Sequence, residues 1–281
     1  MLFGSRDLAL RIEQAECGLL EAAVAAVSER RPERGAEARR IGGGIAAWSG
    51  EGSPLNKVAG LGFAPLPGPA ELAAMERFFA ARGCPVQVEV SNLADPGLLP
   101  LLGARGYRLV AFENVLGRDL RRGVETPASA GDAARAEPID TAGFDRWLDT
   151  VASGFVAPDG DGIPSHETFA RETLEEILGD MAGVPGFVRY LAWRGDAAAG
   201  AASMRLQGGV AQLTGASTLP AHRRRGVQTA LLRRRLADAA DQGCDVAVVA
   251  TQPGSRSQKN AQRNGFELLY SRGVLILEEP G

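Results

Sequence analysis

The chain has few of the residues that build metal sites and disulfides. Its 281 residues include three cysteines, Cys17, Cys84 and Cys244, none of them in a CxxC pair, and two histidines. So few thiol and imidazole ligands argue against a Cys/His metal site. An odd number of separated cysteines is typical of proteins kept in a reducing compartment. We therefore expect no bound metal and a cytoplasmic location.

Long apolar runs and an excess of one charge are also missing. The sequence contains no apolar run of about 18 residues, the length that a membrane span needs, and its first residues are charged, so we expect neither a span nor a signal peptide. The net charge of −3 gives no overall attraction to nucleic acid or anionic lipid. We therefore expect no nucleic-acid or membrane partner, and any site for an anion has to be locally basic.

The overall composition is that of an ordinary globular protein, and the sequence divides into two halves. Apolar residues make up 45% of the chain and charged residues 23%, which is typical of folded domains. Residues 121–130 carry Arg, Gly, Pro and Ser without hydrophobic periodicity, as linkers do. We predict an N-terminal domain over residues 1–120, this linker, and a C-terminal domain over residues 131–281.

Hydrophobic spacing and turn residues predict alternating helices and strands in both halves. The N-terminal half is expected to hold helices at 7–29, 70–82 and 95–105, and strands at 43–48, 57–63, 86–90 and 107–120, the last as one strand or a bent pair. The C-terminal half is expected to hold helices at 141–155, 166–181, 226–242 and 255–263, and strands at 136–139, 186–193, 197–207, 210–218, 245–251, 266–270 and 274–277. Pro138 confines its strand to a sheet edge. This order predicts an α/β (α+β) fold.

The two halves also contain an internal repeat. Residues 82–107 read RGCPVQVEVSNLADPGLLPLLGARGY, and residues 242–266 read QGCDVAVVATQPGSRSQKNAQRNGF. Each segment gives a helix end, Gly-Cys, a buried strand, a short helix and a Gly-aromatic pair, at nearly the same spacing. Two unrelated α/β units with shared turn residues remain an alternative, but matched order and spacing favour a duplication.

A basic turn in the C-terminal half carries the chemistry. Residues 213–232 read LTGASTLPAHRRRGVQTALL, so a strand ends, three arginines and Gly226 follow, and a helix begins. The first N–H groups of a helix lack internal partners and carry partial positive charge, which makes such a turn a site for a pyrophosphate. Gly226 lets the main chain approach the phosphate oxygens, and Thr229 can add a hydroxyl.

This segment resembles motif A of the GNAT superfamily of N-acetyltransferases, Arg/Gln-x-x-Gly-x-Gly/Ala. Arg223, Gly226 and Gln228 take the marked positions; the first two match, and Gln228 replaces the usual small residue. The resemblance extends over residues 131–278. It implies tandem GNAT-like domains, each a mixed, largely antiparallel sheet flanked by helices, an arrangement similar to mycothiol synthase. The N-terminal domain is then a degenerate copy, because it has Ala64–Pro69 in place of the basic turn.

The resemblance implies that acetyl-CoA binds and that its acetyl group passes, by direct attack, to an amine of a small molecule or a protein. In the family the strand before motif A splays from the next strand, here residues 216–218 from residues 249–251, and pairs with the pantetheine arm. The implied cofactor-binding residues are Ala216, Ser217, Thr218, Arg223, Arg224, Arg225, Gly226, Val227, Gln228, Thr229, Ser255 and Asn260.

The usual catalytic side chains are missing. Ala261 stands where many family members have an acid tyrosine, Tyr270 is expected to point elsewhere, and residues 210–218 hold no carboxylate. Asn260 and Ser217 remain weak catalytic candidates, and the general base stays unassigned.

Several polar residues outside the motif are also considered. Asp159, Asp161 and His166 are candidates for contact with the acceptor, although a solvated turn and a helix cap explain them as well. His222 is expected to be a solvent-facing neighbour of the phosphates, and residues 233–235 a solvated basic face.

Two other functions compete with acetyl transfer. A non-catalytic acyl-CoA-binding sensor or interaction module fits the missing tyrosine and carboxylate. A nucleic-acid patch fits the arginines alone, but the net charge and the lack of interleaved aromatic residues argue against it. The sequence leaves the oligomeric state open, a homodimer included.

Overall fold

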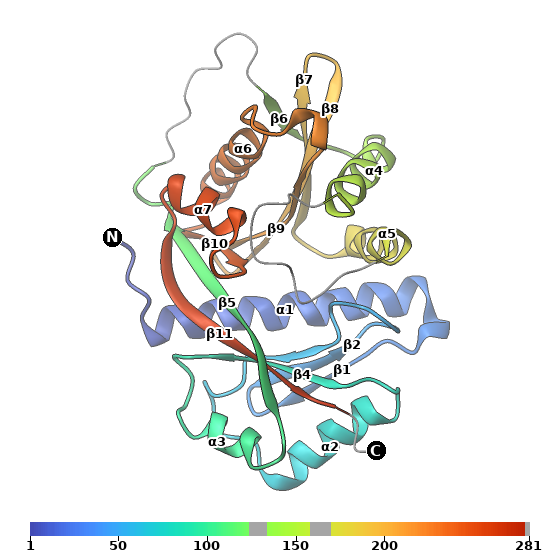
Figure 1. The fold of residues 1–281 in the computed structure, drawn as a ribbon, viewed down its shortest axis with the longest axis vertical. Coiled ribbons are helices and arrows are strands. Elements are labelled where there is room, and N and C mark those ends of the chain that lie inside the picture. The colour runs from blue at the N-terminus through green and yellow to red at the C-terminus, as the bar shows by residue number, and fades with distance from the viewer. Residues whose placement is uncertain (124–133, 158–169, 279–281) are drawn as a thin grey trace.

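The computed structural model describes residues 1–123, 134–157 and 170–278. We call the first range, which ends before the undescribed segment 124–133, the N-terminal half, and the other two the C-terminal half. All strands within these described ranges lie in one 11-stranded sheet with the order β1-β2-β3-β4-β11-β5-β10-β9-β8-β7-β6. The predicted fold class, a mixed and largely antiparallel α+β fold, is confirmed (Figure 1).

The element bounds follow the sequence patterns closely. The N-terminal half contains α1 (Arg6–Arg30), η1 (Pro32–Arg34), β1 (Glu37–Ile41), β2 (Gly44–Trp48), β3 (Lys57–Ala59), α2 (Pro69–Ala80), β4 (Val86–Ser91), α3 (Leu98–Gly103) and β5 (Arg108–Asp119). The C-terminal half contains β6 (Arg135–Pro138), α4 (Phe144–Phe155), α5 (Arg171–Asp180), η2 (Met181–Gly183), β7 (Phe187–Arg194), β8 (Ala197–Gln207), β9 (Val210–Thr218), η3 (Pro220–His222), α6 (Val227–Asp241), β10 (Val246–Thr251), α7 (Arg256–Arg263) and β11 (Glu267–Leu277).

Three sequence expectations need correction. The last two strands, expected at 266–270 and 274–277, are one strand, β11, whose register against β5 shifts at two irregularities. The strand expected at 57–63 ends at Ala59, because glycines with left-handed φ at positions 60 and 62 turn the chain. Strand β1 was not expected at all. As expected, β6 with Pro138 lies at a sheet edge.

The internal repeat is present in the structure. The series α2-β4-α3-β5 and α6-β10-α7-β11 have the same order. Gly83 and Gly243 both end their helices with left-handed φ, 60° and 78°. The following cysteines make matching bonds: the amide of Cys84 donates to the carbonyl of Phe79, and that of Cys244 to Ala239. The two segments are therefore alike in backbone detail as well as in sequence.

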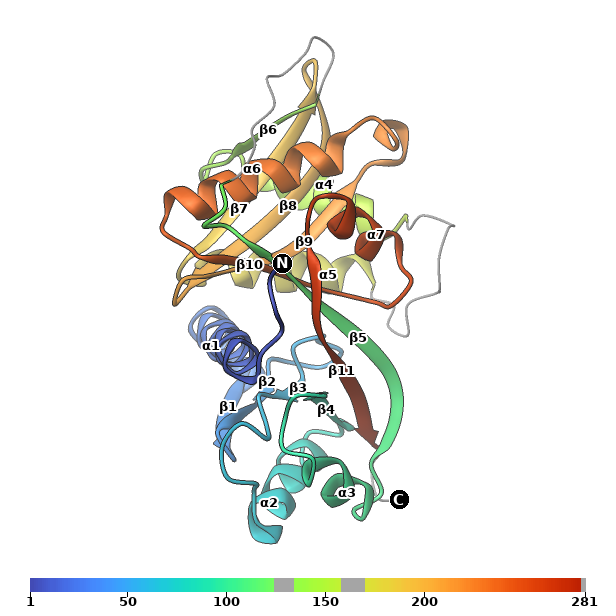
Figure 2. The same ribbon diagram turned by 90° about the vertical axis from the view of Figure 1, so that its left-hand side faces the viewer.

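The last strand of each half pairs with the other half. Strand β5 lies antiparallel beside β10, and β11 lies antiparallel beside β4, while β5 and β11 pair with each other. Figure 2 shows both strands running from one half to the other. The β5–β11 pair therefore lies at the middle of the sheet, with β4, β3, β2 and β1 on one side and β10, β9, β8, β7 and the additional edge strand β6 on the other. The boundaries predicted at residues 121–130 stay a prediction, since most of that segment lies outside the described residues.

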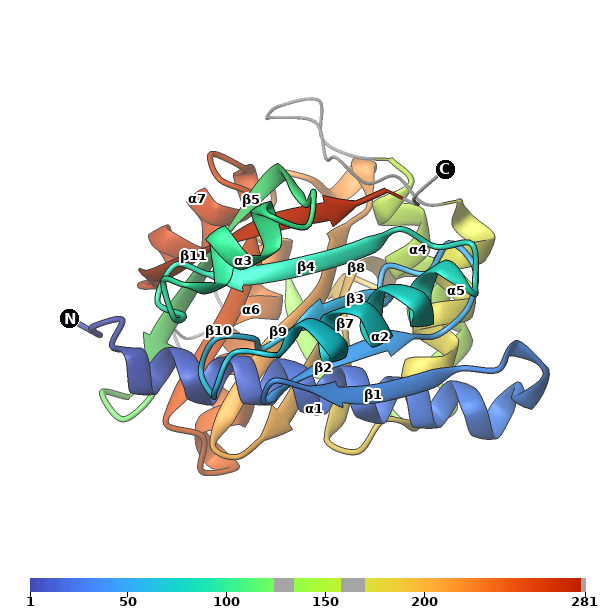
Figure 3. The ribbon, with the colours of Figure 1, turned by 90° about the horizontal axis from the view of Figure 1, so that it is seen from below.

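Helices cover both faces of this sheet. In the C-terminal half α6 packs on one face, and α4 and α5 pack on the other (Figure 1). In the N-terminal half α2 and α3 cover the outer face (Figure 3). Helix α1 of the N-terminal half packs against the C-terminal half, since its Ile12 lies in one cluster with Val115 of β5 and Val210 of β9. Within the described residues, no helix has both the length and the apolar character needed to cross a bilayer.

Candidate active site

Strands β9 and β10 separate from each other in the middle of the sheet. They pair in parallel only where Val210–Gln212 face Val246–Val248. Beyond this point Gly215 adopts a left-handed φ of 52°, and the register of β9 against β8 shifts. The shift leaves Gly215 and Ala216 opposite Ala202 alone, which is a β-bulge. The strand therefore splays as the family resemblance implies, and it exposes Ala216.

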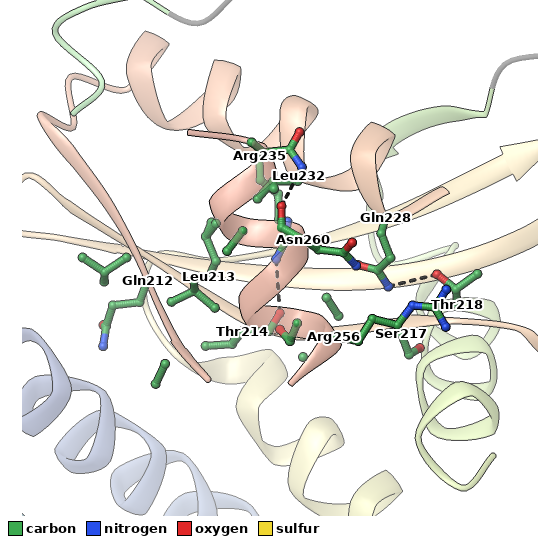
Figure 4. A pocket seen from close by; sticks show the side chains of 18 of the residues that line it. Gln212, Leu213, Thr214, Ser217, Thr218, Gln228, Leu232, Arg235, Arg256 and Asn260 are labelled. Carbon is green, nitrogen blue, oxygen red and sulfur yellow. Dashed lines mark hydrogen bonds between the residues drawn. The ribbon is translucent and has the colours of Figure 1, made fainter. Parts of the chain in front are cut away.

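A buried arginine stabilises the backbone at the bulge. Arg235 reaches from α6 and donates to the carbonyl of Ser203 at 2.9 Å and to that of Thr214 at 3.4 Å (Figure 4). Its side chain is almost completely buried, and this burial lowers its pKa to about 10. The expectation that residues 233–235 form a solvated face is wrong at Arg235, because this side chain lies on the inner side of the helix; Arg233 and Arg234 are exposed as expected.

The basic turn has a backbone suited to an anion. Arg224 has a φ of 61°, the only positive φ of a non-glycine residue in the described part of the chain, and Gly226 follows with 77°. Alternating backbone of this kind turns successive N–H groups to one side. Gly226 is the N-cap of α6, and no side chain of the described residues caps this helix. The first N–H groups of α6 are therefore open to an outside acceptor.

The side chains of the turn divide into two groups. Arg223 donates to the carbonyls of Thr218 and Ala157, so it ties the end of β9 to the segment after α4. Gln228, the departure from the motif, donates to the hydroxyl of Thr218 at 2.9 Å (Figure 4). Its side chain is thus directed to β9. An added Cβ on Gly226 would meet no atom within 4 Å, so the space over this glycine is open.

A cavity of about 870 Å³ joins the turn to the splayed strands and then to the N-terminal half. Ten of the twelve predicted cofactor-binding residues line it, and Arg225 and Ser255 do not. Arg225 is exposed, and Ser255 caps α7 by accepting from the amide of Gln258 at 3.2 Å. Arg256, which the sequence did not single out, lines the cavity and reaches toward Ser217 and Thr218 (Figure 4). The contact of all these residues with a cofactor stays a prediction.

The catalytic candidates from the sequence are only partly placed for chemistry. The hydroxyl of Ser217 donates to the carbonyl of Val151 at 3.1 Å, so α4 engages it. Asn260 lines the cavity. Ala261 also lines it, in the position where the family tyrosine is expected. Tyr270 is buried and donates to Glu13 at 2.7 Å, outside the cavity, as expected.

The remaining sequence predictions concern polar residues outside the motif and a metal site. Asp159, Asp161 and His166 lie outside the described residues. His222 lines the cavity and is half-buried. No group of His, Cys, Asp and Glu in the ranges 1–123, 134–157 and 170–278 could hold a metal ion.

The carboxylates that line the cavity come from the N-terminal half. Glu16 lies on α1 and Glu113 on β5, and the cations Lys57 of β3 and Arg272 of β11 lie beside them. Lys57 contacts Glu16 at 3.1 Å, and Arg272 contacts Glu113 at 3.6 Å. Sequence reasoning missed this group because it looked for acidic site residues only in the C-terminal domain, on the strand at 210–218 and at Asp159 and Asp161.

A signal for these acids existed in the sequence. Glu16 interrupts the apolar stripe of Ile12 and Leu19 on α1, and Glu113 shares a strand face with the buried Val115. An acid on an apolar face is a candidate for function, since unpaired carboxylates are costly to bury.

The fold joins two GNAT-like units in one sheet, and the C-terminal unit has the sequence pattern of an acyltransferase. Residues 149–266 match the sequence model of the acetyltransferase (GNAT) family. The C-terminal half of the chain thus belongs to the GNAT acetyltransferases, a family that uses acyl-CoA. No curated protein sequence matches the chain.

Solved structures resemble this protein over most of its length. A GCN5-related N-acetyltransferase from Kribbella flavida is 20% identical, with a TM-score of 0.63 over 92% of this chain and 95% of that one. A tandem GNAT protein from the clavulanic acid biosynthesis pathway is 15% identical, with a TM-score of 0.61 over 86% and 81%. A GCN5-related N-acetyltransferase from Sphaerobacter thermophilus is 16% identical, with a TM-score of 0.58 over 88% and 77%. At these identities the likeness shows the tandem GNAT fold.

Proposed function

We propose that this protein transfers the acetyl group of acetyl-CoA to a primary amine of a small molecule or a protein. The observation that carries the proposal is the continuous cavity from the basic turn, past the β9 bulge, to the carboxylates of the N-terminal half. The two ends of this cavity differ in chemistry. One suits a pyrophosphate, and the other suits an amine.

At the cofactor end, the residues present fit acetyl-CoA. The open N–H groups of α6 and the main chain around Gly226 bind the pyrophosphate, and Arg224 adds positive charge. The exposed edge of β9 at the bulge accepts the pantetheine arm as an added strand would be accepted. The amides near Ala216 polarise the thioester carbonyl, so that charge developing on its oxygen is stabilised.

The experiment is a calorimetric titration of the full chain with CoA. We expect one site per chain, because α6 begins at the basic turn, whereas α2 begins with Pro69 and carries an acid, Glu71, in its first turn. Gly226→Glu is expected to weaken binding by at least about a hundredfold, or about 2.7 kcal/mol, because it places a carboxylate against the pyrophosphate.

Gly68→Glu, at the N-cap of α2, is the matched control and is expected to leave the CoA affinity unchanged. Circular dichroism checks that both variants fold. A folded Gly226→Glu protein with wild-type affinity for CoA would refute the placement of the cofactor.

A second function is an acyl-CoA sensor without turnover, and Ala261 favours it, because no tyrosine lines the described part of the cavity. A thiol-release assay with acetyl-CoA and a panel of primary amines separates the two functions. Binding of acetyl-CoA without release of CoA for any amine would support the sensor.

A further inference from the structure

The charged residues at the acceptor end differ sharply in their partners. Lys57 lies between Glu16 and Glu89, at 3.1 and 2.9 Å. Arg272 is held by Glu13 at 2.8 Å and Glu89 at 3.4 Å. The side chains of Arg272, Glu13 and Glu89 are almost completely buried, and those of Lys57 and Glu16 are largely buried. Each of them takes part in an ion pair of hydrogen-bond length. They form a fixed framework.

Glu113 is the loosely held member of the group. Its one ion pair within the described residues, to Arg272, spans 3.6 Å, and 28% of its side chain is exposed, against 3% for Glu89. It also lines the cavity, whereas Glu13 and Glu89 do not. A carboxylate that faces the cavity with free lone pairs can accept a proton from a bound molecule.

The position of Glu113 along β5 brings it to the splayed strands. The next residue, Asn114, pairs with Thr251 at the end of β10, where β10 has already left β9. Val115, on the same strand face as Glu113, lines the cavity together with Val249 and Ala250. Glu113 is thus on the strand next to β10, just past the last paired residue of β10, on the side of α1.

The surroundings tune Glu113 for proton transfer at neutral pH. Burial and the charges of Glu89 and Glu16 raise the pKa of Glu113 to about 7, while Lys57 and Arg272 oppose this rise. These four residues, from α1, β3, β4 and β11, are the charged groups around it. A base with a pKa near the working pH is the most effective kind.

Glu16, the other carboxylate in the cavity, is unsuited to this task. Burial alone would raise the pKa of Glu16, but Lys57, Arg272 and Arg205 outweigh the effect and lower it. Glu16 is therefore a weak base held by a lysine. Its charge instead favours a cationic ligand at this end of the cavity.

We propose that Glu113, contributed by the N-terminal half on the exchanged strand β5, is the catalytic base that deprotonates the acceptor ammonium. This proposal rests on the proposed function. Glu113 takes one proton from the ammonium, and the nitrogen lone pair forms a C–N bond to the thioester carbon. The C–S bond breaks, the second amine proton goes to the leaving sulfur, and Glu113 releases its proton to water.

The test compares Glu113→Gln with wild type in acetyl transfer to two probes. n-Butylamine is an ammonium at neutral pH and needs a base, whereas methoxyamine is already uncharged. With n-butylamine we expect kcat of Glu113→Gln to fall on the order of a hundredfold, and with methoxyamine less than about tenfold. The wild-type rate with n-butylamine should rise through an inflection near pH 7, where Glu113 ionises, and Glu113→Gln should lose that inflection.

Two controls and the contrary outcomes complete the experiment. Glu113→Asp should keep the inflection at a reduced rate, and Glu137→Gln on the distant edge strand β6 should behave as wild type. Equal losses for both probes, or an inflection that persists in folded Glu113→Gln, would overturn the role of Glu113. Acetyl-CoA binding by wild type without turnover of either probe would also overturn it. A failure of the cofactor assignment is distinguishable, because wild type would then not bind acetyl-CoA.

Discussion

The two halves of this molecule differ clearly at the N-termini of α2 and α6, the longer helices of the repeat. In the C-terminal half, the N-cap Gly226 has a left-handed φ of 77°, three arginines precede it, and no side chain in the part of the chain that the structure describes caps α6. In the N-terminal half, Gly68 has an ordinary φ of −72°, Pro69 begins α2, and Glu71 accepts from the amide of Gly68 at 2.8 Å. Proline has no N–H to offer, and the Glu71 carboxylate puts a negative charge in the first turn, where an outside anion would otherwise be attracted.

The comparison indicates that the two copies contribute different groups to one site. Both keep splayed strands, since β3 and β4 pair only at Val58 and Val88. One copy retains an open, basic helix start at the cofactor end. The other has a proline and an acid in the first turn of α2, and it contributes Glu16, Lys57 and Glu113 to the opposite end of the same cavity.

The largest expected effect comes from separating the halves. A protein of residues 131–281 leaves β10 without β5 and β11 without β4, so both lose their antiparallel neighbours and expose unpaired edges. We expect this fragment not to unfold cooperatively on heating, as followed by circular dichroism. Coexpression with residues 1–123 should restore a folded complex. A monomeric, cooperatively folding C-terminal fragment would show that the exchanged strands are dispensable.

The strand exchange marks the limit of what the sequence could predict. Helix α6, the turn at Gly226 and the repeat around Gly83 and Gly243 were predictable because periodicity and left-handed turn residues act locally. The pairing of β5 with β10 was not, because strand partners are chosen between segments far apart in the chain. Glu113 was not predicted as a site residue for the same reason, because its strand was assigned to the N-terminal domain alone.

The burial of Arg235 behind the bulge was not predicted from the sequence, for another reason. Three consecutive arginines at 233–235 suggest a solvated face, but consecutive helical positions point in different directions. Arg235 therefore turns inward while Arg234 pairs with Asp238 on the surface at 2.9 Å. In the N-terminal half, Met75 stands at the same interval before its left-handed glycine and is buried like Arg235.

An intermediate effect on stability is expected from Arg235→Met, which gives α6 the residue type that α2 has at the equivalent position, Met75. Arg235→Met removes the donors to the carbonyls of Ser203 and Thr214, which then lie buried without a partner. We expect the free energy of unfolding to fall by about 2 kcal/mol, measured by urea denaturation, and the CoA affinity to fall because the bulge relaxes.

Arg234→Met, which removes an exposed i,i+4 pair, is the matched control and should cost less than about 0.5 kcal/mol. Equal effects of the two substitutions would mean that Arg235 does not support the bulge.

The smallest expected effect tests whether Glu71 fills the anion place of α2. Glu71→Ala removes the bond to the Gly68 amide and the negative charge in the first turn, so we expect urea denaturation to show a loss of about 0.3–1 kcal/mol. Glu51→Ala, at an exposed turn of the same half, should change nothing. CoA should still bind at one site per chain, because Pro69 and the missing arginines leave α2 without a phosphate turn. A second CoA site in Glu71→Ala would instead mean that this single acid keeps the N-terminal copy closed.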